Sequence, residues 1–262
     1  MIGYNRLGIN GRLANQMFQY ASLRGIAAKH GYEWTIPPED RETHNMADYN
    51  IMDGFKLPHL KNKGFVTADW PVHDEPCHDF DPEFFENCPD NINLEGFRQS
   101  EKYFKHIEDE VRNEFKFLDH IVEDCKGAVE IFDNPVALHI RRGDFLINSV
   151  HHHNLSMKYY EEALKQFDSD RQVIIFSDDT DWCKSQPLFE DDRFLVCEGG
   201  GPYTDLYMMS KCDDFIIANS TFSWWGAWLS NSEHVIAPKL WFGPDGQDPK
   251  DIYVDRWRYL DV

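Results

Sequence analysis

The stretch "DFIIANSTFSWWGAWLS", Asp214–Ser230, contains the pattern that decides the fold. It begins with an apolar run of strand length, passes through small polar residues, and continues into a tryptophan-rich run of helical length. A buried strand that leads through a short turn into a helix is the repeating unit of a parallel α/β sheet.

The same alternation extends through the C-terminal half of the chain. Strands are predicted at "VALHI", "QVIIFS", "RFLVC", "DFIIANS" and "HVIAP", and helices at "SMKYYEEALKQF", "DTDWCKSQ", "PYTDLYMMSKC" and "FSWWGAWLS". Strands that are apolar almost throughout are typical of a parallel sheet covered by helices on both faces. We therefore predict that residues 134–262 form a Rossmann-like domain.

The N-terminal half has a less regular pattern. "NGRLANQMFQYASLRGIAAKHG" predicts a glycine-bearing turn that enters a helix, and "YEWTIP" predicts a short strand ended by prolines. Residues 40–93 show no persistent period and are predicted to be irregular. "EKYFKHIEDEVRNEFKFL" has the apolar spacing of an amphipathic helix. We assign residues 1–133 to a separate N-terminal domain.

Composition narrows the class of protein. The 262 residues include 26 Lys and Arg against 46 Asp and Glu, which gives a net charge of −20. This balance argues against a nucleic-acid partner, because binding phosphate backbones needs a basic face. The six cysteines show no C-x-x-C pairing and are predicted to be reduced thiols of an intracellular protein. No signal peptide or transmembrane segment is recognised. We expect a cytoplasmic protein, with attachment to the periphery of a membrane left open.

Two arginines stand out in this acidic chain, in "HIRRGDF", His139–Phe145. They follow a predicted strand, and ligands of open parallel sheets bind outside the carboxyl ends of the strands. Arg141 and Arg142 can offer forked N–H donors to a diphosphate. The small polar residues that enter the tryptophan-rich helix lie at another strand end, where a helix N-terminus favours phosphate; they are Ser220, Thr221 and Ser223. These features together predict a nucleotide diphosphate site.

Other interpretations of the same residues remain open. The arginines could be surface ion-pair partners of Asp144, and the tryptophan-rich block could be a capped core helix. Asp178 and Asp179 could bind a metal, although an acidic helix N-terminus is the favoured interpretation. The chain has neither G-x-G-x-x-G nor G-x-x-x-x-G-K-[ST], which disfavours hydride transfer by a dinucleotide and P-loop phosphotransfer.

Four segments carry a resemblance to a known family. "GRLANQMFQYA", "HIRRGDF", "IFSDD" and "DLYMMSKCDDFIIANSTFSWWGAWLS" match, in order and spacing, the motif set of the family 11 fucosyltransferases, the α-1,2-fucosyltransferases. The resemblance covers nearly the whole chain. It implies an α/β fold of the GT-B type, with two facing Rossmann-like domains, the C-terminal one a parallel sheet covered by helices.

The resemblance also implies an activity. Such an enzyme moves L-fucose from GDP-β-L-fucose to the 2-hydroxyl of a galactoside, with inversion at the anomeric carbon. Its partners would be GDP-fucose and a galactose-terminated glycan acceptor, and it would need no metal or other cofactor. The alternative is a nucleotide-sugar or carbohydrate-binding protein without turnover.

Individual residues receive roles by this resemblance. Arg141 would stabilise the leaving diphosphate together with Arg142 and the hydroxyls of residues 220–223. Asp205 would accept the adjacent N–H donors of guanine, and His139 would bond the base or the ribose. Without the family, Asp205 is a carboxylate at a helix N-terminus and His139 is a satisfied core histidine.

The N-terminal domain is expected to contribute to the cleft between the domains through "GRLANQMFQYA". Gly11 permits a tight turn, and Asn15 and Gln16 would supply neutral amides near the reacting groups. The alternative is a helix packed inside its own domain with both amides exposed.

The general base stays open. Asp144 is the carboxylate within the arginine motif, and the triplet "HHH", residues 151–153, follows nearby. The candidates are Asp144, a histidine of the triplet, or no strong base at all. For the triplet itself a solvated loop is favoured over a metal site.

Overall fold

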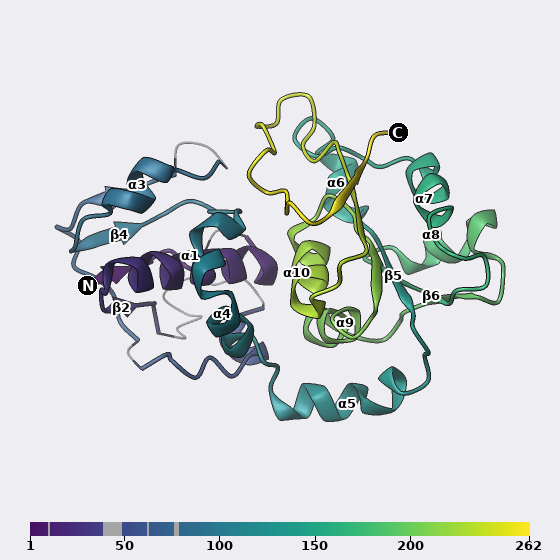
Figure 1. Ribbon diagram of the computed structural model, residues 1–262, viewed down its shortest axis with the longest axis horizontal. Helices are drawn as coiled ribbons and strands as arrows, with labels where there is room; N and C mark the ends of the chain where they lie inside the picture. The colour runs from purple at the N-terminus through teal and green to yellow at the C-terminus, as the bar shows by residue number, and fades with distance from the viewer. Residues whose placement is uncertain (10, 39–48, 62, 76–78) are drawn as a thin grey trace. The chain divides into compact units, whose positions relative to one another are not determined.

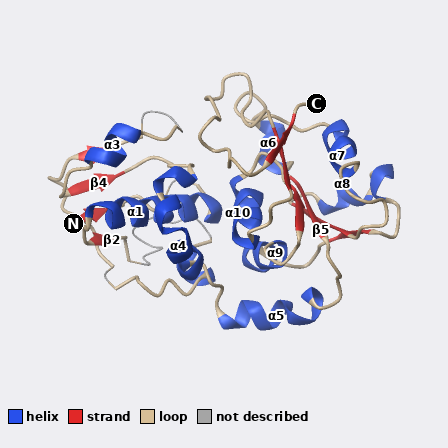
Figure 2. Cartoon of the chain, viewed as in Figure 1, coloured by secondary structure: helices blue, strands red, loops and turns tan. Residues whose placement is uncertain are grey.

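The computed structural model describes residues 1–9, 11–38, 49–61, 63–75 and 79–262 (Figures 1 and 2). It divides into two compact units. The first unit comprises Met1–Leu118 and Asp248–Val254, and the second comprises Asp119–Gln247 and Asp255–Val262. The boundary predicted from the sequence lies after residue 133. The difference is α5 (Asp119–Val129), which packs against α9 (Pro202–Met209) of the second unit.

A six-stranded parallel sheet forms the centre of the second unit. Its strand order is β10-β9-β8-β5-β6-β7, and its strands are β5 (Val136–Ile140), β6 (Val173–Ser177), β7 (Phe194–Val196), β8 (Asp214–Ile216), β9 (Val235–Pro238) and β10 (Arg258–Leu260). Successive strands run outward from β5 on one side and from β8 on the other. The chain order therefore reverses between β5 and β8, which makes this the switch point of the sheet.

Helices cover both faces of this sheet, as the sequence predicts. They are α6 (Gly143–Ile147), α7 (Met157–Leu164), α8 (Thr180–Lys184), α9 and α10 (Thr221–Ser230), with a 3-10 turn at Pro187–Phe189. Figure 1 shows α7 and α8 on one side and α9 and α10 on the other. Val136, Leu138 and Ile140 pack with residues of α7 and α8, whereas the alternate residue His139 reaches α10. Every strand and helix predicted after residue 134 is confirmed.

The first unit contains a smaller parallel sheet. Its order is β2-β1-β4-β3, with β1 (Ile2–Gly3), β2 (Trp34–Thr35), β3 (Val72–His73) and β4 (Ile92–Leu94). The predicted helix of "GRLANQMFQYA" is α1 (Leu13–His30), which is almost entirely buried and ends at Gly31 in a left-handed conformation. The predicted strand in "YEWTIP" is β2.

Two predictions for the first unit were wrong. Residues 40–93 were expected to be irregular, yet they include α2 (Ile51–Gly54), β3, α3 (Pro82–Asn87) and β4; residues 40–48, 62 and 76–78 of that range lie outside the described residues. Side-chain caps start both helices: Asn50 accepts from the N–H of residue 52, and Asp81 from that of residue 84.

The single amphipathic helix expected from "EKYFKHIEDEVRNEFKFL" is divided. It forms two 3-10 turns, Glu101–Tyr103 and Lys105–Ile107, followed by α4 (Glu108–Glu114). Phe104 leaves the helical conformation, with φ −132° and ψ 4°, and its buried ring packs near Phe18 at 6.3 Å between centroids. Burying this ring outweighs the helical preference of the segment.

The C-terminal return of the chain to the first unit rests on charged contacts. Asp251 is buried, accepts a hydrogen bond of 2.9 Å from the N–H of Phe80, and pairs with Lys102. Lys250 pairs with Asp79 at 2.7 Å. These contacts explain why Asp248–Val254 belongs to the first unit although the residues around it belong to the second.

Two further expectations from the sequence concern the cysteines, expected to be reduced thiols, and the helices, none of which was expected to span a membrane. Cys88, Cys125, Cys183, Cys197 and Cys212 are free thiols, and Cys77 lies outside the described residues. Within the parts of the chain that the structure describes, no helix combines the length and the apolar character of a membrane span.

Gly25 provides a test of the packing around α1. A Cβ at this position would lie 1.9 Å from the carbonyl oxygen of Tyr103 and 2.8 Å from the Cα of Phe104. We expect Gly25→Ala to lower the free energy of unfolding by about 1–3 kcal/mol, because backbone must move to admit the methyl group. Urea denaturation measures this change.

Gly127, in α5, is the matched control. A Cβ there would meet nothing within 4 Å, so Gly127→Ala should be neutral or stabilising by up to about 1 kcal/mol. Equal effects of the two substitutions would contradict the close approach of α1 to the chain at Tyr103.

Candidate active site

The carboxyl ends of β5, β6 and β8 place the predicted site residues. β5 pairs with β6 in parallel, with Ile140 opposite Ser177, so the turn after β5 lies beside the turn after β6. We name residues 141–144 the arginine turn. β8 pairs with β5 on its other side, and the residues that enter α10 follow β8. The arginine turn therefore lies at the switch point of the sheet.

Both arginines are held by carboxylates. Arg141 pairs with Asp144 and, through Nη1, with Asp178 Oδ2 at 2.8 Å. Arg142 Nε donates to Asp179 Oδ2 at 3.0 Å. The pairing with Asp144, which the sequence left open as an alternative, is present, and Asp178 and Asp179 were missed as arginine partners. Because a guanidinium has five N–H donors, these contacts orient each group without using all its donors.

A flat surface supports the second arginine. The Cζ of Arg142 lies 3.7 Å from the ring centroid of Trp182, which fixes the plane of the guanidinium. Asp179 accepts from the N–H of Trp182 as the N-cap of α8. This confirms that Asp179 belongs to an acidic helix N-terminus, as favoured from the sequence.

Gly143 allows the two turns to approach. A Cβ on Gly143 would lie 2.4 Å from Asp178 Oδ2, and the other oxygen of Asp178 accepts from the N–H of Arg142 at 2.9 Å. A side chain at position 143 would displace the carboxylate that clamps both arginines. The "RGD" part of the motif is thus explained by packing as well as by charge.

His139 and Ser223 form a buried link between β5 and α10. The Nδ1 of His139 and the Oγ of Ser223 are 2.8 Å apart, and the two residues are 5% and 0% exposed. Burial, with a smaller contribution from Arg141, lowers the pKa of His139 to about 3, so the imidazole is neutral. The sequence assigned both residues to direct contact with a donor. Both are buried beneath the surface, where they position the groups that lie above them.

The accessible polar groups of this helix are those of its first residues. Ser220 is the N-cap of α10, and its side chain accepts from the N–H of Phe222. Ser220 and Thr221 are half-buried. The N-terminus of α10 therefore presents backbone N–H groups and these hydroxyls next to the arginine turn, an arrangement that favours an anion.

Asp205 lies at the carboxyl edge beyond β7, in the first turn of α9. Burial raises the pKa of Asp205 to about 6, against a smaller opposing effect of the Cys197 thiol, whose Sγ lies 3.9 Å from Oδ1. A Cβ on Gly200 would lie 2.3 Å from the same oxygen. The carboxyl group is half-buried against the turn "EGGG" at the N-terminus of α9, which agrees with the interpretation as a helix N-terminal carboxylate, and its role as guanine acceptor stays a prediction.

Of the three residues predicted to contribute from the N-terminal domain, Gln16 is accounted for by contacts inside the first unit, and the cleft roles of Gly11 and Asn15 stay predictions. Gly11 has φ +84°, and Asn15 Oδ1 accepts from Gln99 Nε2 at 3.1 Å. Gln16 is fully buried, and its amide bonds to the backbone of residues 49–51 at both ends. This corrects the prediction for Gln16, because its amide is used inside the first unit. It also corrects the alternative in which that amide was exposed.

Among the described residues, no group of three or more His, Cys, Asp or Glu is arranged to hold a metal ion. Metal independence remains a prediction for experiment.

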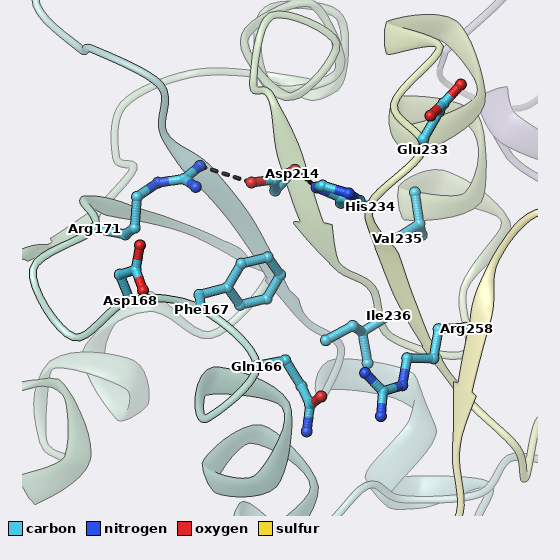
Figure 3. A pocket seen from close by; sticks show the side chains of 10 residues that line it. All are labelled: Gln166, Phe167, Asp168, Arg171, Asp214, Glu233, His234, Val235, Ile236 and Arg258. Atoms are coloured by element: carbon cyan, nitrogen blue, oxygen red, sulfur yellow. Dashed lines mark hydrogen bonds and ion pairs between the residues drawn. The ribbon is translucent and has the colours of Figure 1, made fainter.

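The second unit also contains a cavity of about 390 Å³ at the opposite edge of its sheet (Figure 3). Arg171 pairs there with Asp214 at 2.8 Å and donates to the carbonyl of Asn134 at 2.8 Å. These contacts connect the segments that enter β5, β6 and β8. We place the site at the carboxyl edge instead, because parallel sheets bind ligands there and the motif residues meet there.

Comparison with known proteins bears on this geometry. The model of the family described as glycosyl transferase family 11 matches residues 1–261. The chain belongs to glycosyl transferase family 11. The resemblance inferred from its four motifs is therefore confirmed.

Proteins named for glycosyl transfer are among the relatives of this chain. An α-1,2-colitosyltransferase of Escherichia coli is 29% identical over 94% of this chain and 95% of its own length. A galactoside α-(1,2)-fucosyltransferase 1 of Leontocebus fuscicollis is 27% identical over 95% of this chain and 72% of its own. The O-antigen biosynthesis glycosyltransferase WbnK of Escherichia coli is 38% identical, but the match spans only 51% of this chain and 45% of that protein.

Solved structures confirm the fold. The fucosyltransferase NodZ from Bradyrhizobium superimposes with a TM-score of 0.59 at 13% identity, over 91% of this chain and 94% of that one. POFUT1 in complex with GDP gives a TM-score of 0.56 at 12% identity, over 98% and 97%. The family 11 chain thus has the α/β fold of the GT-B type that its motifs implied.

The buried His139 gives a pH-dependent test. Unfolded, its imidazole binds a proton near pH 6.5, whereas in the fold it stays neutral down to about pH 3. Between these two pH values the unfolded state binds one proton more than the folded state. The free energy of unfolding therefore falls as the pH is lowered across this range, by up to about 1.4 kcal/mol per pH unit. His139→Gln should make the dependence of unfolding free energy on pH shallower by this amount.

Denaturant unfolding at several pH values between about 4 and 7 measures the effect. The exposed His120 supplies the control, since His120→Gln should leave the slope of the wild type unchanged. An unchanged slope in His139→Gln would mean that His139 is not held neutral by the fold.

Proposed function

We propose that this chain is an inverting galactoside α-1,2-fucosyltransferase, with GDP-β-L-fucose as donor and a galactose-terminated glycan as acceptor. The observation that carries the proposal is the clamped arginine turn beside the N-terminus of α10, at the switch point of a sheet in a family 11 chain. A nucleoside diphosphate suits this arrangement because it presents two anionic groups to two forked cations and a helix N-terminus.

The arginine turn suits a departing diphosphate in particular. As the bond between sugar and diphosphate breaks, negative charge grows on the leaving oxygen. Arg141 is held by Asp144 and Asp178, so it need not reorganise when that charge appears. A fixed guanidinium can therefore supply the stabilisation that a metal ion gives in other transferases, and we propose that no metal is required.

Arg142 and α10 would complete the diphosphate site. Arg142 is fixed by Asp179 and Trp182, and Ser220 and Thr221 stand at the helix N-terminus. In this proposal Ser223 and His139 act beneath them, since their hydrogen bond links α10 to the strand that bears the arginines.

Asp205 is the proposed guanine-binding residue. Guanine presents adjacent N–H donors, which a carboxylate can accept with both oxygens. Asp205 occupies the same carboxyl edge of the sheet, beyond β7, and is enclosed by the turn at Gly200. Because burial raises its pKa to about 6, donors that stabilise the carboxylate would lower this pKa again on binding.

The sugar transferred is the finer part of the proposal. One relative is named for colitosyl transfer and another for fucosyl transfer, at 29% and 27% identity. Both names specify a 1,2-linkage. We favour fucose because the chain's motifs resemble those of the α-1,2-fucosyltransferases, and colitose is the alternative that the first of these relatives supports.

The direct test offers both donors. The protein is incubated with GDP-fucose or GDP-colitose and lactose, with EDTA present, and GDP release and the trisaccharide are measured. We expect a fucosylated trisaccharide at a rate that EDTA does not change. Transfer of colitose alone would correct the donor, and loss of activity in EDTA that Mn²⁺ or Mg²⁺ restores would show that a metal is needed. Binding of GDP-fucose without turnover for any galactoside would favour a binding protein.

Arg141→Lys tests the role of the arginine turn in the same assay. An ammonium group keeps the charge but cannot form the planar fork, so we expect kcat to fall by about 100-fold or more. Arg258→Lys, an exposed arginine of β10, is the control and should retain activity. A lysine variant at position 141 with nearly wild-type turnover would remove Arg141 from the proposed site.

Asp205→Asn tests the base-binding assignment by calorimetry. The substitution places an amide donor against guanine's own donors, which costs about 1–3 kcal/mol, so GDP should bind roughly tenfold more weakly or worse. UDP binding should change little. The exposed Asp213→Asn serves as the control. Equal GDP affinity in the wild type and Asp205→Asn would reject the assignment.

A further inference from the structure

The histidine triplet, residues 151–153, lies in a loop with His151 exposed, as the sequence favoured, and backbone hydrogen bonds hold this loop in a defined position. The N–H of His152 donates to the carbonyl of Asn148 at 3.0 Å, at the end of α6. The carbonyl of His153 accepts from Asn219 Nδ2 at 2.8 Å. Asn219 directly precedes the N-terminus of α10. The triplet is therefore hydrogen-bonded both to the end of α6 and to the segment that leads into α10.

A second set of backbone contacts holds the other side of the triplet. His152 forms an antiparallel bridge with Phe242, and the carbonyl of His151 accepts from the N–H of Gly243 at 2.8 Å. A Cβ on Gly243 would lie 2.4 Å from the carbonyl oxygen of Val150. The close approach of these two segments therefore depends on a glycine, and the triplet has a defined position.

The His152 side chain stands beside the arginine turn. Its ring stacks on that of Phe145, with centroids 4.0 Å apart and planes 3° from parallel. The Cζ of Arg141 lies 5.3 Å from the centroid of the same phenylalanine. Phe145 is buried and belongs to α6. Its ring therefore contacts both the His152 imidazole and the Arg141 guanidinium and positions them relative to each other.

The surroundings keep this imidazole neutral. Burial lowers the pKa of His152 below the ordinary histidine value, and Arg141 and His151 lower it further, while Asp144 opposes them. The ring is half-buried, so part of it stays accessible. His152 is thus an unprotonated and accessible base at neutral pH.

We propose that His152 is the general base of the transfer, accepting the proton of the acceptor hydroxyl. This inference rests on the proposed function. As the acceptor oxygen bonds to the anomeric carbon of the donor, its proton passes to a ring nitrogen of His152, which becomes imidazolium. The bond from the anomeric carbon to the diphosphate oxygen breaks, and its electron pair leaves with GDP, whose new charge meets Arg141.

Asp144 is the competing base, and its contacts argue against it. Its carboxylate is ion-paired with Arg141. Protonating that carboxylate would weaken the pair that orients the arginine just as the arginine must meet the departing charge. A proton on His152 does not disturb this pair, and the new imidazolium lies near the Asp144 carboxylate that favours its charge.

The experiment is a pH–rate profile with a matched neighbour. His152→Gln and His151→Gln remove adjacent imidazoles of the triplet; the His152 ring stacks on Phe145, whereas His151 is exposed. The wild-type kcat/KM should fall as the pH decreases through a value below the ordinary histidine pKa. In His152→Gln kcat should drop by about 100-fold or more and this acid limb should disappear, with GDP affinity unchanged. His151→Gln should keep both the rate and the acid limb.

Other outcomes overturn the inference. An acid limb that persists in His152→Gln and disappears in Asp144→Asn assigns the base to Asp144. A wild-type protein that transfers neither fucose nor colitose under these conditions rejects the proposed function itself. The wild-type rate, measured in the same assay, distinguishes this outcome from the failure of His152 as the base. If His152→Gln loses GDP binding, the measurement is repeated with His152→Asn. A near-wild-type kcat in either variant rejects the role of His152.

Discussion

The ion pairs between the turns after β5 and β6 are the constraint on which the second unit's chemistry depends. A guanidinium that leaves water needs fixed partners, because burying an unpaired charge is costly. Arg141 and Arg142 follow a fully buried strand and meet Asp178 and Asp179 of the neighbouring strand's end. The parallel register makes these residues neighbours, and Gly143 lets the Asp178 carboxylate approach. The acidic excess of the chain thus has a local use: carboxylates hold the cations in place.

Preorganisation of this kind explains several features around the arginines. His139 lies one residue before Ile140 on the same strand, and a protonated imidazole there would place a further buried cation next to Arg141; the fold instead keeps it neutral and uses it to bond Ser223. Trp182 offers its ring to Arg142, and Phe145 lies under both Arg141 and His152. Aromatic faces orient cations without adding a further negative charge, so Trp182 and Phe145 help to fix the guanidinium planes and leave N–H donors for a ligand.

The predictability of the fold follows from the length of its apolar runs. β5 and β6 span five residues each and are recognisable from composition alone, whereas β1 and β3 have two residues each and carry no period. The equally short β2 could be predicted because prolines mark its end. The edge of the sheet that bears the site could be predicted, because parallel strands all end there. The partners of the arginines could not, since Asp178 and Arg141 lie far apart in sequence and only the register joins them. The position of the histidine triplet depends equally on contacts remote in sequence, to Asn219 and Gly243.

In the tryptophan-rich block, one part of a family motif builds the fold, and another part presents the polar groups of the proposed site. Trp224, Trp225 and Trp228 are fully buried and pack against one another and, through Trp224, against Trp257. A Cβ on Gly226 would lie 2.3 Å from the Sδ of Met209, so the glycine lets α10 approach α9. These residues never need to touch a ligand. They fix the axis of α10, and the axis decides where its N-terminal N–H groups and Ser220 point. The most specific part of the sequence is therefore informative about the proposed diphosphate site, because it sets the direction of the α10 N-terminus, and it carries no signal that identifies the acceptor.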